Sequence, residues 1–466
     1  MNIDIIIYIT QFLEDFNKIQ MLSVNKKMHL LKNKIKYQNF YSIVTIQNLW
    51  YIDQITNVLV TGEKYLDKLS RINNDVNEKK CINKIILPKN VKFIIFGRRF
   101  DKKIKKDFIP PNVTHLVFGI SFNQNIKGCL PLKITHLTFG TNFNRDITGC
   151  LPPNIIYLTF GYSFNQYIRD RLPESITHLT FGSEFNQDVT DCLPSKITHL
   201  TFGYRFDQYI KNHLPESITH LTFGALYNQN IKNSLPLYVT HLTLGHGFDQ
   251  NIKDCFPSSI THLTFIGFFN QNIKDCLPAN ITHLTFGYGF NQNIKDCLPS
   301  SITHLIFGWD FNQNIKDYLP ANVTHLTFGH DFNQNIKDCI PARVTHLTFG
   351  YKFNQNIKDC LPSSVTHLTY TILYSVSIIR NIPATVTHLQ IEVNYYYYYY
   401  YGYIEYFCPL NITHLVFLDK SIILNSNQRI ENRSKNIVHH IFRNFNKYCY
   451  ITIFSCLITT LICILL

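Results

Sequence analysis

A pattern of apolar and polar positions recurs every 21 residues over most of the chain between Pro88 and Phe417. Each copy reads Pro-x-x-Ile-Thr-His-Leu-Thr-Phe-Gly-x-x-Phe-Asn-Gln-x-Ile-Lys-Asp-Cys-Leu with small variations. The prolines that follow Pro88 and mark the copies are Pro110, Pro131, Pro152, Pro173, Pro194, Pro215, Pro236, Pro257, Pro278, Pro299, Pro320, Pro341, Pro362 and Pro383. A fixed period of this kind indicates a solenoid, whose coils bury their apolar faces only by stacking on one another.

The first half of each copy predicts a β-strand. In Ile-Thr-His-Leu-Thr-Phe we expect Ile, Leu and Phe to point inward, and His and the second Thr to point outward. Thr, Val and Ile suit the pleated surface of a sheet. The glycine that follows has no side chain, so the chain can turn there as it leaves the sheet.

The second half of each copy holds an inward Phe and Ile and carries an Asn or Asp five residues after the strand Phe. A buried amide at this place can donate to and accept from the backbones of neighbouring coils. The return through Lys-Asp-Cys-Leu-Pro is too short for a helix and ends in proline. We therefore expect an extended or 3₁₀ return path.

Two sequence patterns in the copies resemble known repeats. The strand pattern I-x-x-L-x-F is similar to that of leucine-rich repeats, whose strands stack into a parallel sheet. The pattern F-N-x-x-I-x-x-x-x-P, as in Phe122-Asn-Gln-Asn-Ile126 followed by Pro131, resembles the FNIP repeat, a relative of the leucine-rich repeat. The resemblance implies a mainly β, leucine-rich-repeat-like solenoid of about sixteen coils with a parallel sheet on one face. It also implies binding rather than catalysis.

The N-terminal segment does not follow the repeat. Apolar residues at near-helical spacing predict a small helical region over residues 2–33. Their order resembles an F-box, the motif that docks on the Skp adaptor of cullin-type ubiquitin ligases, although the usual Leu-Pro at its start is absent. In the FNIP family an F-box before the repeats is a familiar pairing. The resemblance implies adaptor-docking residues Ile9, Phe12, Leu13, Ile19, Leu22 and Val24. The alternative is an amphipathic cap on the open end of the solenoid.

Changes in composition divide the chain into further segments. We expect a helical F-box-like segment at residues 1–40 and a linker at 41–87, which contains a degenerate first coil at Ile55–Val60. The repeats follow at 88–418, a polar and basic linker at 419–448 and an apolar tail at 449–466. A run of tyrosines at 395–401 coincides with five extra residues between two repeat prolines, and it is interpreted as an inserted loop.

The positive charge lies outside the repeats. Residues 1–109 carry 20 Lys or Arg against 10 Asp or Glu, residues 110–409 carry 18 against 19, and residues 410–466 carry 6 against 2. Affinity for nucleic acid depends on clustered Lys and Arg that neutralise phosphates. A nucleic-acid partner along the nearly neutral repeats is therefore disfavoured.

The cysteines indicate a reducing compartment, and with it a cytoplasmic location. The chain has 13 of them, but its N-terminus lacks the basic region of a signal peptide. Eight occupy one repeat position: Cys129, Cys150, Cys192, Cys255, Cys276, Cys297, Cys339 and Cys360. One column of thiols cannot easily surround zinc, so we interpret these residues as small apolar spacers.

The outward histidines predict a ladder of imidazole rings. Its members are His115, His136, His178, His199, His220, His241, His262, His283, His304, His325, His346, His367, His388 and His414, with Tyr157 in one gap. Their outward neighbours are threonines, and no carboxylate is placed to complete a metal site, so neither metal nor cofactor is predicted. Neutral rings packed edge to edge and hydrogen-bonded along the sheet are the main interpretation, and contact with a partner is the alternative. In either case, protonation below about pH 6 should weaken the array.

Recognition is expected where the copies differ. The two residues after the strand Gly vary most, and aromatic residues and arginine at an exposed edge are typical of interface anchors. The variable residues at this rim include Glu184, His246, Asp310, His330 and Asp331, and the candidate partner-binding residues among them are Tyr162, Tyr204, Arg205, Tyr288, Trp309, Tyr351 and Lys352.

The C-terminal tail 449–466 has 18 residues without a charge. As a helix it would be about 27 Å long, which is enough to span a bilayer, and Arg443 and Lys447 before it would keep the repeats in the cytosol. The alternative is a buried strand or helix that covers the last coil.

The sequence contains no nucleophile and base pair, phosphate loop or paired carboxylates outside the repeat ladders, so we do not expect an enzyme. It predicts a protein–protein interaction module, namely a substrate-recruiting F-box adaptor with a Skp-type adaptor and a target protein as partners. The alternative is a structural scaffold without ligase contact, which could be tail-anchored to a membrane.

Overall fold

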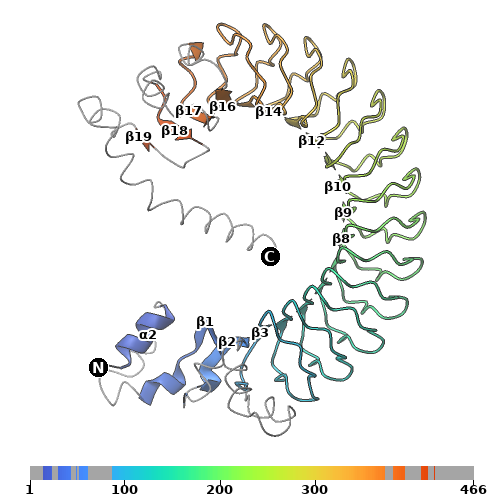
Figure 1. Cartoon of the computed structure of the whole chain (residues 1–466), viewed down its shortest axis with the longest axis vertical. Helices are drawn as coiled ribbons and strands as arrows, with labels where there is room; N and C mark the ends of the chain where they lie inside the picture. The colour runs from blue at the N-terminus through green and yellow to red at the C-terminus, as the bar shows by residue number, and fades with distance from the viewer. Residues whose placement is uncertain are drawn as a thin grey trace. The chain divides into compact units, whose positions relative to one another are not determined.

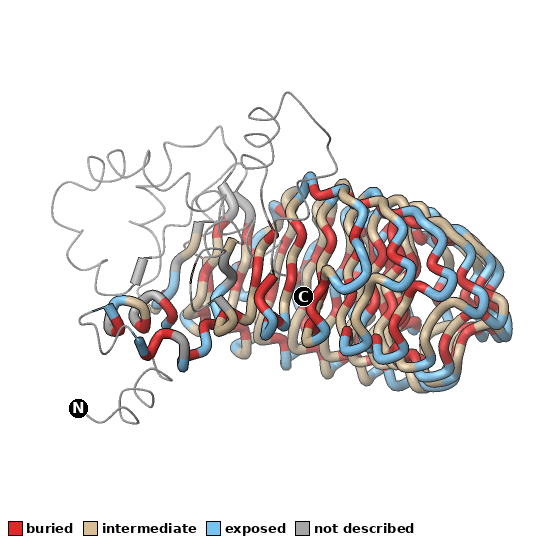
Figure 2. The backbone as a smooth tube through the Cα atoms, turned by 90° about the horizontal axis from the view of Figure 1, so that it is seen from below, coloured by how far each residue is buried: buried red, intermediate tan, exposed pale blue. Residues whose placement is uncertain are grey.

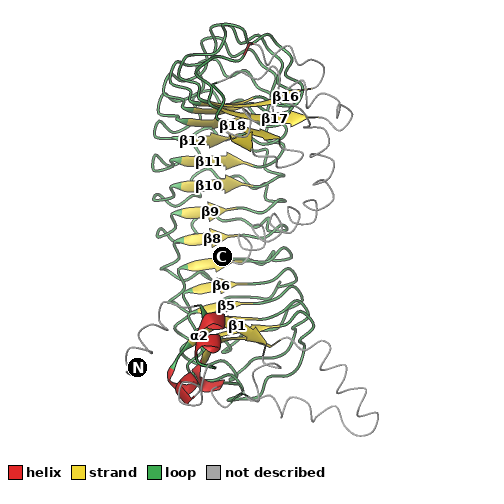
Figure 3. Cartoon of the chain, turned by 90° about the vertical axis from the view of Figure 1, so that its left-hand side faces the viewer, coloured by secondary structure: helices red, strands yellow, loops and turns green. Residues whose placement is uncertain are grey.

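One short parallel strand per coil is the element that the repeats contribute. The computed structural model describes residues 14–23, 30–42, 49, 52–60, 87–372, 381–393, 411–417 and 424–425. They fall into two units, Met1–Phe248 and Asp249–Leu466. Within each unit, Figures 1 and 3 show the strands side by side on one face of the stacked coils, with loops completing each coil.

The described strands of the first unit pair in chain order and are all parallel. They are β1 (Tyr37–Ser42), β2 (Ile55–Val60), β3 (Phe93–Phe96), β4 (His115–Val117), β5 (His136–Thr138), β6 (Tyr157–Thr159), β7 (His178–Thr180), β8 (His199–Thr201), β9 (His220–Thr222) and β10 (His241–Leu244).

In the second unit, β11 to β18 pair in parallel in the same way, and β19 closes on β18 as an antiparallel strand. These strands are β11 (His262–Phe265), β12 (His283–Thr285), β13 (His304–Ile306), β14 (His325–Thr327), β15 (His346–Thr348), β16 (His367–Ile372), β17 (His388–Val393), β18 (His414–Phe417) and β19 (Leu424–Asn425). The last strand lies in the segment that we expected to be a linker.

Equivalent residues of successive repeats pair with each other. For example, His199 pairs with His220 and Leu200 with Leu221. Because one repeat makes one coil, every repeat position becomes a column along the sheet. The mainly β, leucine-rich-repeat-like solenoid predicted from the sequence is confirmed.

The core consists of the inward columns that the sequence pattern predicted. In one coil Ile134, Leu137, Phe139, Phe143 and Ile147 are each at most 2% exposed, and the same positions are buried in the other described coils. Figure 2 shows these buried positions recurring at the same place from coil to coil. Each coil is one layer thick, so its core is shared with the coils before and after it.

Ring spacings show that the coils of each unit splay apart on the side away from the sheet face. Along the outward face, His178 and His199 have ring centroids 4.1 Å apart, which is less than the ~4.8 Å strand spacing. In the core, Phe118 and Phe139 are 5.6 Å apart, and Phe122 and Phe143 are 6.2 Å apart. The histidine face is therefore the inner side of the bend.

The Asn column forms the predicted ladder between coils. The backbone N–H of Asn144 donates to Oδ1 of Asn123 at 3.0 Å, and that of Asn165 donates to Oδ1 of Asn144 at 3.0 Å. The ladder begins one coil earlier than we identified, at Asp101, which accepts from the Asn123 N–H. The expectation of a buried column is wrong, because these side chains are half-buried or exposed.

The return path consists of turns. The residue after the repeat Lys has a positive φ, for example 58° at Asp254 and 63° at Asn212. Asp, Asn and Gly tolerate this left-handed conformation better than other residues, which explains the composition of the column.

The N-terminal region joins the sheet earlier than predicted. The described helices are α2 (Asp15–Met21), η1 (Leu30–Lys34) and η2 (Ile52–Gln54). Strand β1 crosses the boundary we set at residue 40, and β2 covers Ile55–Val60, so two strands precede the repeats. Strand β1 was missed because Tyr-Gln-Asn-Phe-Tyr-Ser lacks the repeat pattern.

Two segments with separate predictions lie outside the described residues. They are the tyrosine run 395–401 and the apolar tail 449–466. In the part of the chain that is described, no helix has the length and apolarity needed to cross a membrane.

Tyr227 takes the place of a core Phe and is a test of the packing. Its side chain is fully buried, its hydroxyl has no hydrogen-bond partner among the described residues, and burial, with a contribution from Asp207, raises its pKa. Tyr227→Phe should raise the free energy of unfolding by about 1 kcal/mol, because an unsatisfied buried hydroxyl is removed. The matched control is Tyr370→Phe, which should lower it by about 1 kcal/mol, since Tyr370 Oη donates to the Phe353 carbonyl at 3.0 Å. Urea denaturation measures the free energy of unfolding of both variants. A lower value for Tyr227→Phe would contradict the interpretation that the Tyr227 hydroxyl is buried without a hydrogen bond.

Candidate protein-interaction surfaces

A column of glycines places the variable residues at the edge of the sheet. A Cβ on Gly140 would lie 1.9 Å from the carbonyl oxygen of Gly119, and one on Gly224 would lie 1.6 Å from that of Gly203. None of these glycines has a positive φ. Contact between coil backbones therefore leaves no room for a side chain at these positions, which adds a packing reason for glycine where the chain leaves the sheet; one coil carries Ile266 instead. The next two residues form a rim beside this close contact.

The predicted rim residues are on the surface. Tyr162, Tyr204, Tyr288 and Trp309 are each about half exposed. In the first unit, Tyr162 and Tyr204 follow β6 and β8, so one coil separates them, and Arg205 Nε lies 3.0 Å from Glu184 Oε2.

In the second unit the rim forms an aromatic stack. The rings of Trp309 and His330 lie 4.0 Å apart, and those of His330 and Tyr351 lie 4.9 Å apart. His330 Nδ1 contacts Asp331, and Lys352 Nζ lies 3.0 Å from Asp331 Oδ2. Burial would raise the pKa of Asp331, but hydrogen bonds from His330 and Lys352 outweigh it and hold that pKa below its usual range. The sequence placed all five of these residues on the rim, and the structure shows that His330 and Asp331 connect Trp309 with Tyr351 and Lys352.

A shallow hollow of about 370 Å³ lies beside this stack, and sequence analysis missed part of its lining. Ile266 and Ile306 contribute to it together with Tyr288, Trp309 and His330. Both isoleucines are more than 40% exposed. Ile306 stands where most coils carry Thr, and Ile266 stands where they carry Gly. Departure from the repeat was the signal that could have found them.

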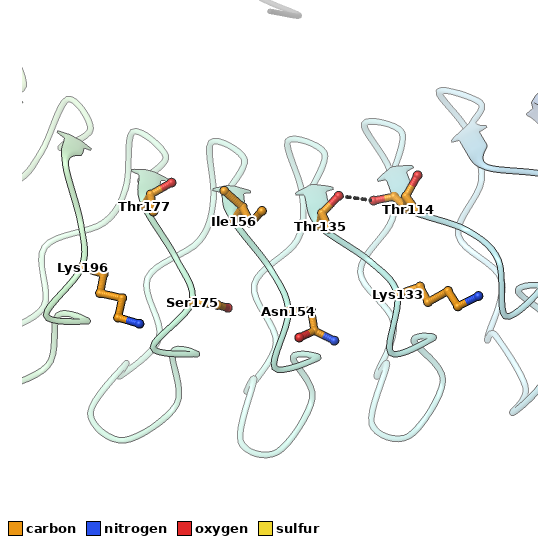
Figure 4. A pocket seen from close by; sticks show the side chains of 8 residues that line it. All are labelled: Thr114, Lys133, Thr135, Asn154, Ile156, Ser175, Thr177 and Lys196. Carbon is orange, nitrogen blue, oxygen red and sulfur yellow. Dashed lines mark hydrogen bonds between the residues drawn. The ribbon is translucent and has the colours of Figure 1, made fainter.

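The first unit has a more polar groove of about 670 Å³ (Figure 4). One row of its lining consists of Thr114, Thr135, Ile156 and Thr177, and the other of Lys133, Asn154, Ser175 and Lys196. Figure 4 shows the rows running across successive coils, with Thr135 bonded to Thr114. Here too the groove includes a departure from the repeat, since Ile156-Tyr157 replaces Thr-His.

The histidine rings form the predicted ladder, but they stack face to face rather than edge to edge. Neighbouring rings are about 4 Å apart, and Nδ1 of His136 lies 2.9 Å from Oγ1 of the preceding Thr135. Burial and neighbouring histidines lower the pKa of His115 and of His199 to about 4, so these two rings are neutral at pH 7. Among the described residues, no three His, Cys, Asp or Glu side chains are grouped so that they could hold a metal ion.

The cysteine column is buried or half-buried, and its members form no disulfide within the described residues. Cys297 Sγ donates to the Lys295 carbonyl at 3.1 Å, and burial raises its pKa. A raised pKa makes a thiol less reactive, which agrees with a packing role.

The predicted adaptor-docking residues are only partly described. Ile9, Phe12, Leu13 and Val24 lie outside the described residues, and Ile19 is half-buried on α2. Leu22 is fully buried within the chain, so its assignment as an adaptor contact is wrong for this structure.

Helix α2 also packs at the start of the sheet. Oδ2 of Asp15 accepts hydrogen bonds from the backbone N–H groups of Gln38 and Asn39 in β1, at 2.7 and 2.6 Å. Oδ1 pairs with the buried Lys18 at 2.8 Å. The helix therefore satisfies backbone donors of the first strand, as a cap would.

The family profile described as FNIP Repeat matches this chain ten times between residues 79 and 369, which is more than half of its length. The chain belongs to the FNIP repeat family.

Two comparisons place the FNIP repeats of this chain among known proteins. A protein of Acanthamoeba polyphaga mimivirus, described as F-box and FNIP repeat-containing, is 34% identical over 102 residues, which make up 22% of this chain and 33% of that protein. The crystal structure of CroV588, described as a circular leucine-rich-repeat protein, has 41% identity and a TM-score of 0.61, covering 72% of this chain and 54% of CroV588. The match thus spans a third of the length of the mimivirus protein and about half of the length of CroV588.

Each letter of the FNIP motif has a structural role here. In one repeat, Phe122 and Ile126 are fully buried and Asn123 belongs to the ladder between coils. The carbonyl of Pro131 accepts the N–H of Ile134 in the turn that leads into the next strand. The motif residues build the scaffold, which leaves the rim and the two hollows as the candidate interaction surfaces.

Proposed function

We propose that this protein is a substrate-recruiting F-box adaptor of a cullin-type ubiquitin ligase. The N-terminal segment would dock on a Skp-type adaptor, and the rim of the FNIP repeats would hold a target protein. The observation that carries the binding role is the stack of Trp309, His330 and Tyr351 at the edge of the sheet, in which Trp309 is half exposed, because aromatic anchors supply much of the affinity of protein interfaces. The F-box description of the mimivirus relative supports the ligase assignment.

Co-purification of the full chain with a recombinant Skp-type adaptor tests this role. Phe12→Glu should reduce recovery of the adaptor by at least about tenfold, because a charge would enter an apolar docking contact. Gln20→Glu is the matched control, since it adds the same charge at an exposed position of α2. Recovery should be unchanged with it, and both variants should melt like the wild type. Equal recovery with Phe12→Glu, or none with the wild type, would refute adaptor docking.

The second candidate is a repeat scaffold without ligase contact. The hydrogen bonds that Asp15 accepts from β1 support it, because an end cap satisfies the backbone donors of the first strand in this way. In this case binding by the rim is retained and the Skp-type adaptor is not recovered. We place the protein in the cytoplasm in both cases, and in the second we include a membrane anchor at 449–466.

A further inference from the structure

The hollow in the second unit combines two apolar departures from the repeat with a tryptophan at a variable rim position. Ile306 replaces Thr on the sheet face, Ile266 replaces the strand Gly, and Trp309 occupies a rim position that carries Tyr288 and His330 in the neighbouring coils. Together with Tyr288 they form an apolar surface on three successive coils. The neighbouring coils carry Thr at the position of Ile306, and two coils of the first unit carry Thr141 and Ser183 at the position of Trp309, so coil stacking does not require these two side chains.

Polar groups without partners border this apolar surface. The carboxylate of the exposed Asp310 makes no ion pair or hydrogen bond with the described residues, although its backbone N–H donates to Tyr288 at 2.9 Å. The hydroxyls of Thr264, Thr285 and Thr327 line the hollow and likewise lack a partner within the described part of the chain. They lie on β11, β12 and β14, and so at multiples of the ~4.8 Å strand spacing.

We propose that this surface, formed by Ile266, Tyr288, Ile306, Trp309 and Asp310 and called here the Trp309 patch, binds an extended segment of a partner protein. The segment places a large apolar side chain against Ile306 and Trp309 and pairs a Lys or Arg with Asp310. The threonine hydroxyls bond its backbone. This assignment rests on the proposed role in protein binding, and it specifies the chemistry of the target.

Charge distinguishes this partner from other macromolecules. Lys352, the cation on the same rim, is paired with Asp331, whereas Asp310 is a carboxylate available for pairing. A phosphate backbone or an anionic membrane would meet negative charge at the patch, and each would need cations that it does not supply. A basic residue flanked by apolar ones gains an ion pair with Asp310, while its apolar neighbours pack on Ile306 and Trp309.

Selection of displayed random peptides on the full chain tests the proposal. The wild type should enrich peptides that pair a large apolar residue with Lys or Arg. Two variants restore residues found in other coils and should keep the fold, namely Ile306→Thr and Trp309→Ser, and each should weaken binding of a selected peptide at least about tenfold. Asp310→Lys introduces the residue type that another coil carries at the same repeat position, Lys352. This variant should shift the selected peptides toward Asp and Glu in place of Lys and Arg.

A fluorescence titration provides the second measurement. The chain has two tryptophans, so in a Trp50→Phe background the emission reports on Trp309 alone. Selected peptides should shift this emission. The proposal would be overturned if the wild type enriched peptides no better than Ile306→Thr does. It would also be overturned if the wild type and Asp310→Lys selected peptides of the same charge.

Other outcomes separate this proposal from the general binding role. If selected peptides bind Ile306→Thr normally but are lost with Tyr204→Ser, binding by the repeats stands and the Trp309 patch is the wrong surface. If the full chain self-associates and Trp309→Ser abolishes this association, the occupant is a second copy and the proposal fails.

Discussion

Replacing Gly224 by alanine should lower the free energy of unfolding by about 3 kcal/mol or more. The new Cβ would lie 1.6 Å from the carbonyl oxygen of Gly203, and the obstacle is backbone rather than a movable side chain. The coils could avoid the clash only by separating, which would break the parallel pairing of β8 with β9. Urea denaturation followed by circular dichroism measures the loss.

A second glycine offers a matched control. Gly128 has a φ of 69°, and a Cβ there would meet nothing within 4 Å. Asn212 and Asn233 occupy the same repeat position with similar φ values. Gly128→Asn should therefore change the free energy of unfolding by less than about 1 kcal/mol. If Gly224→Ala were as mild as Gly128→Asn, close stacking would not be the reason for the glycine column.

Acidification from pH 7.5 to pH 5 should lower the melting temperature by roughly 10 °C. Eleven described histidines of the ladder have a lowered pKa, through burial first and through neighbouring ladder histidines in most of them. In the unfolded chain their pKa is about 6.5. Below that pH the unfolded state binds more protons than the folded state, so stability falls as the pH falls.

The window and size of this effect follow from the pKa values. The loss begins near pH 6.5 and levels off near pH 4, where His115 and His199 also become protonated in the folded state. Because the rings are partly exposed, solvent screening reduces each contribution to a few tenths of a kcal/mol by pH 5, which sums to several kcal/mol. Hydrogen bonds from threonines lower the pKa values of Asp146 and Asp188. The stability that these two carboxylates contribute is therefore lost only below about pH 4, outside the measured pH range.

A ladder variant tests whether the histidines cause this pH dependence. Tyr157 already replaces a histidine in the ladder and stacks 4.4 Å from His136 and 4.2 Å from His178. The triple change His178→Tyr, His199→Tyr, His220→Tyr should therefore keep the stack and make the melting temperature less sensitive to pH between 7.5 and 5. A wild-type melting temperature that does not change over this range would contradict the neutral ladder.

The scaffold was largely predictable because one residue pattern is repeated. In-register stacking converts each repeat position into a column, so one copy of Ile, Leu and Phe is enough to predict the core, and one Asn is enough to predict the ladder. Strand β1 could not be predicted, because its sequence shares no position with the repeat and its place depends on pairing with β2. The cap at Asp15 depends on backbone N–H groups 23 and 24 residues later, which no local pattern indicates.

The candidate surface was predicted in part. Variation after the strand Gly identified Trp309 and Tyr351, but their joining through His330 became evident only when the coils were stacked. Ile306 is a single departure in sequence. Its importance comes from lining the same hollow as Tyr288 and Trp309, and that is decided by the spacing between coils.

By itself, the sequence determined the period, the strand in each coil, the inward columns and the family of the repeat, because these depend on positions within one copy. The tertiary structure decided what depends on the distance between copies. That distance leaves no room for a side chain after most strands, lowers the pKa of the stacked histidines and gathers Ile266, Ile306 and Trp309 into the Trp309 patch. These interactions between coils arise because parallel strands stack closely, and the sequence of a single copy of the repeat does not specify the distance to its neighbours.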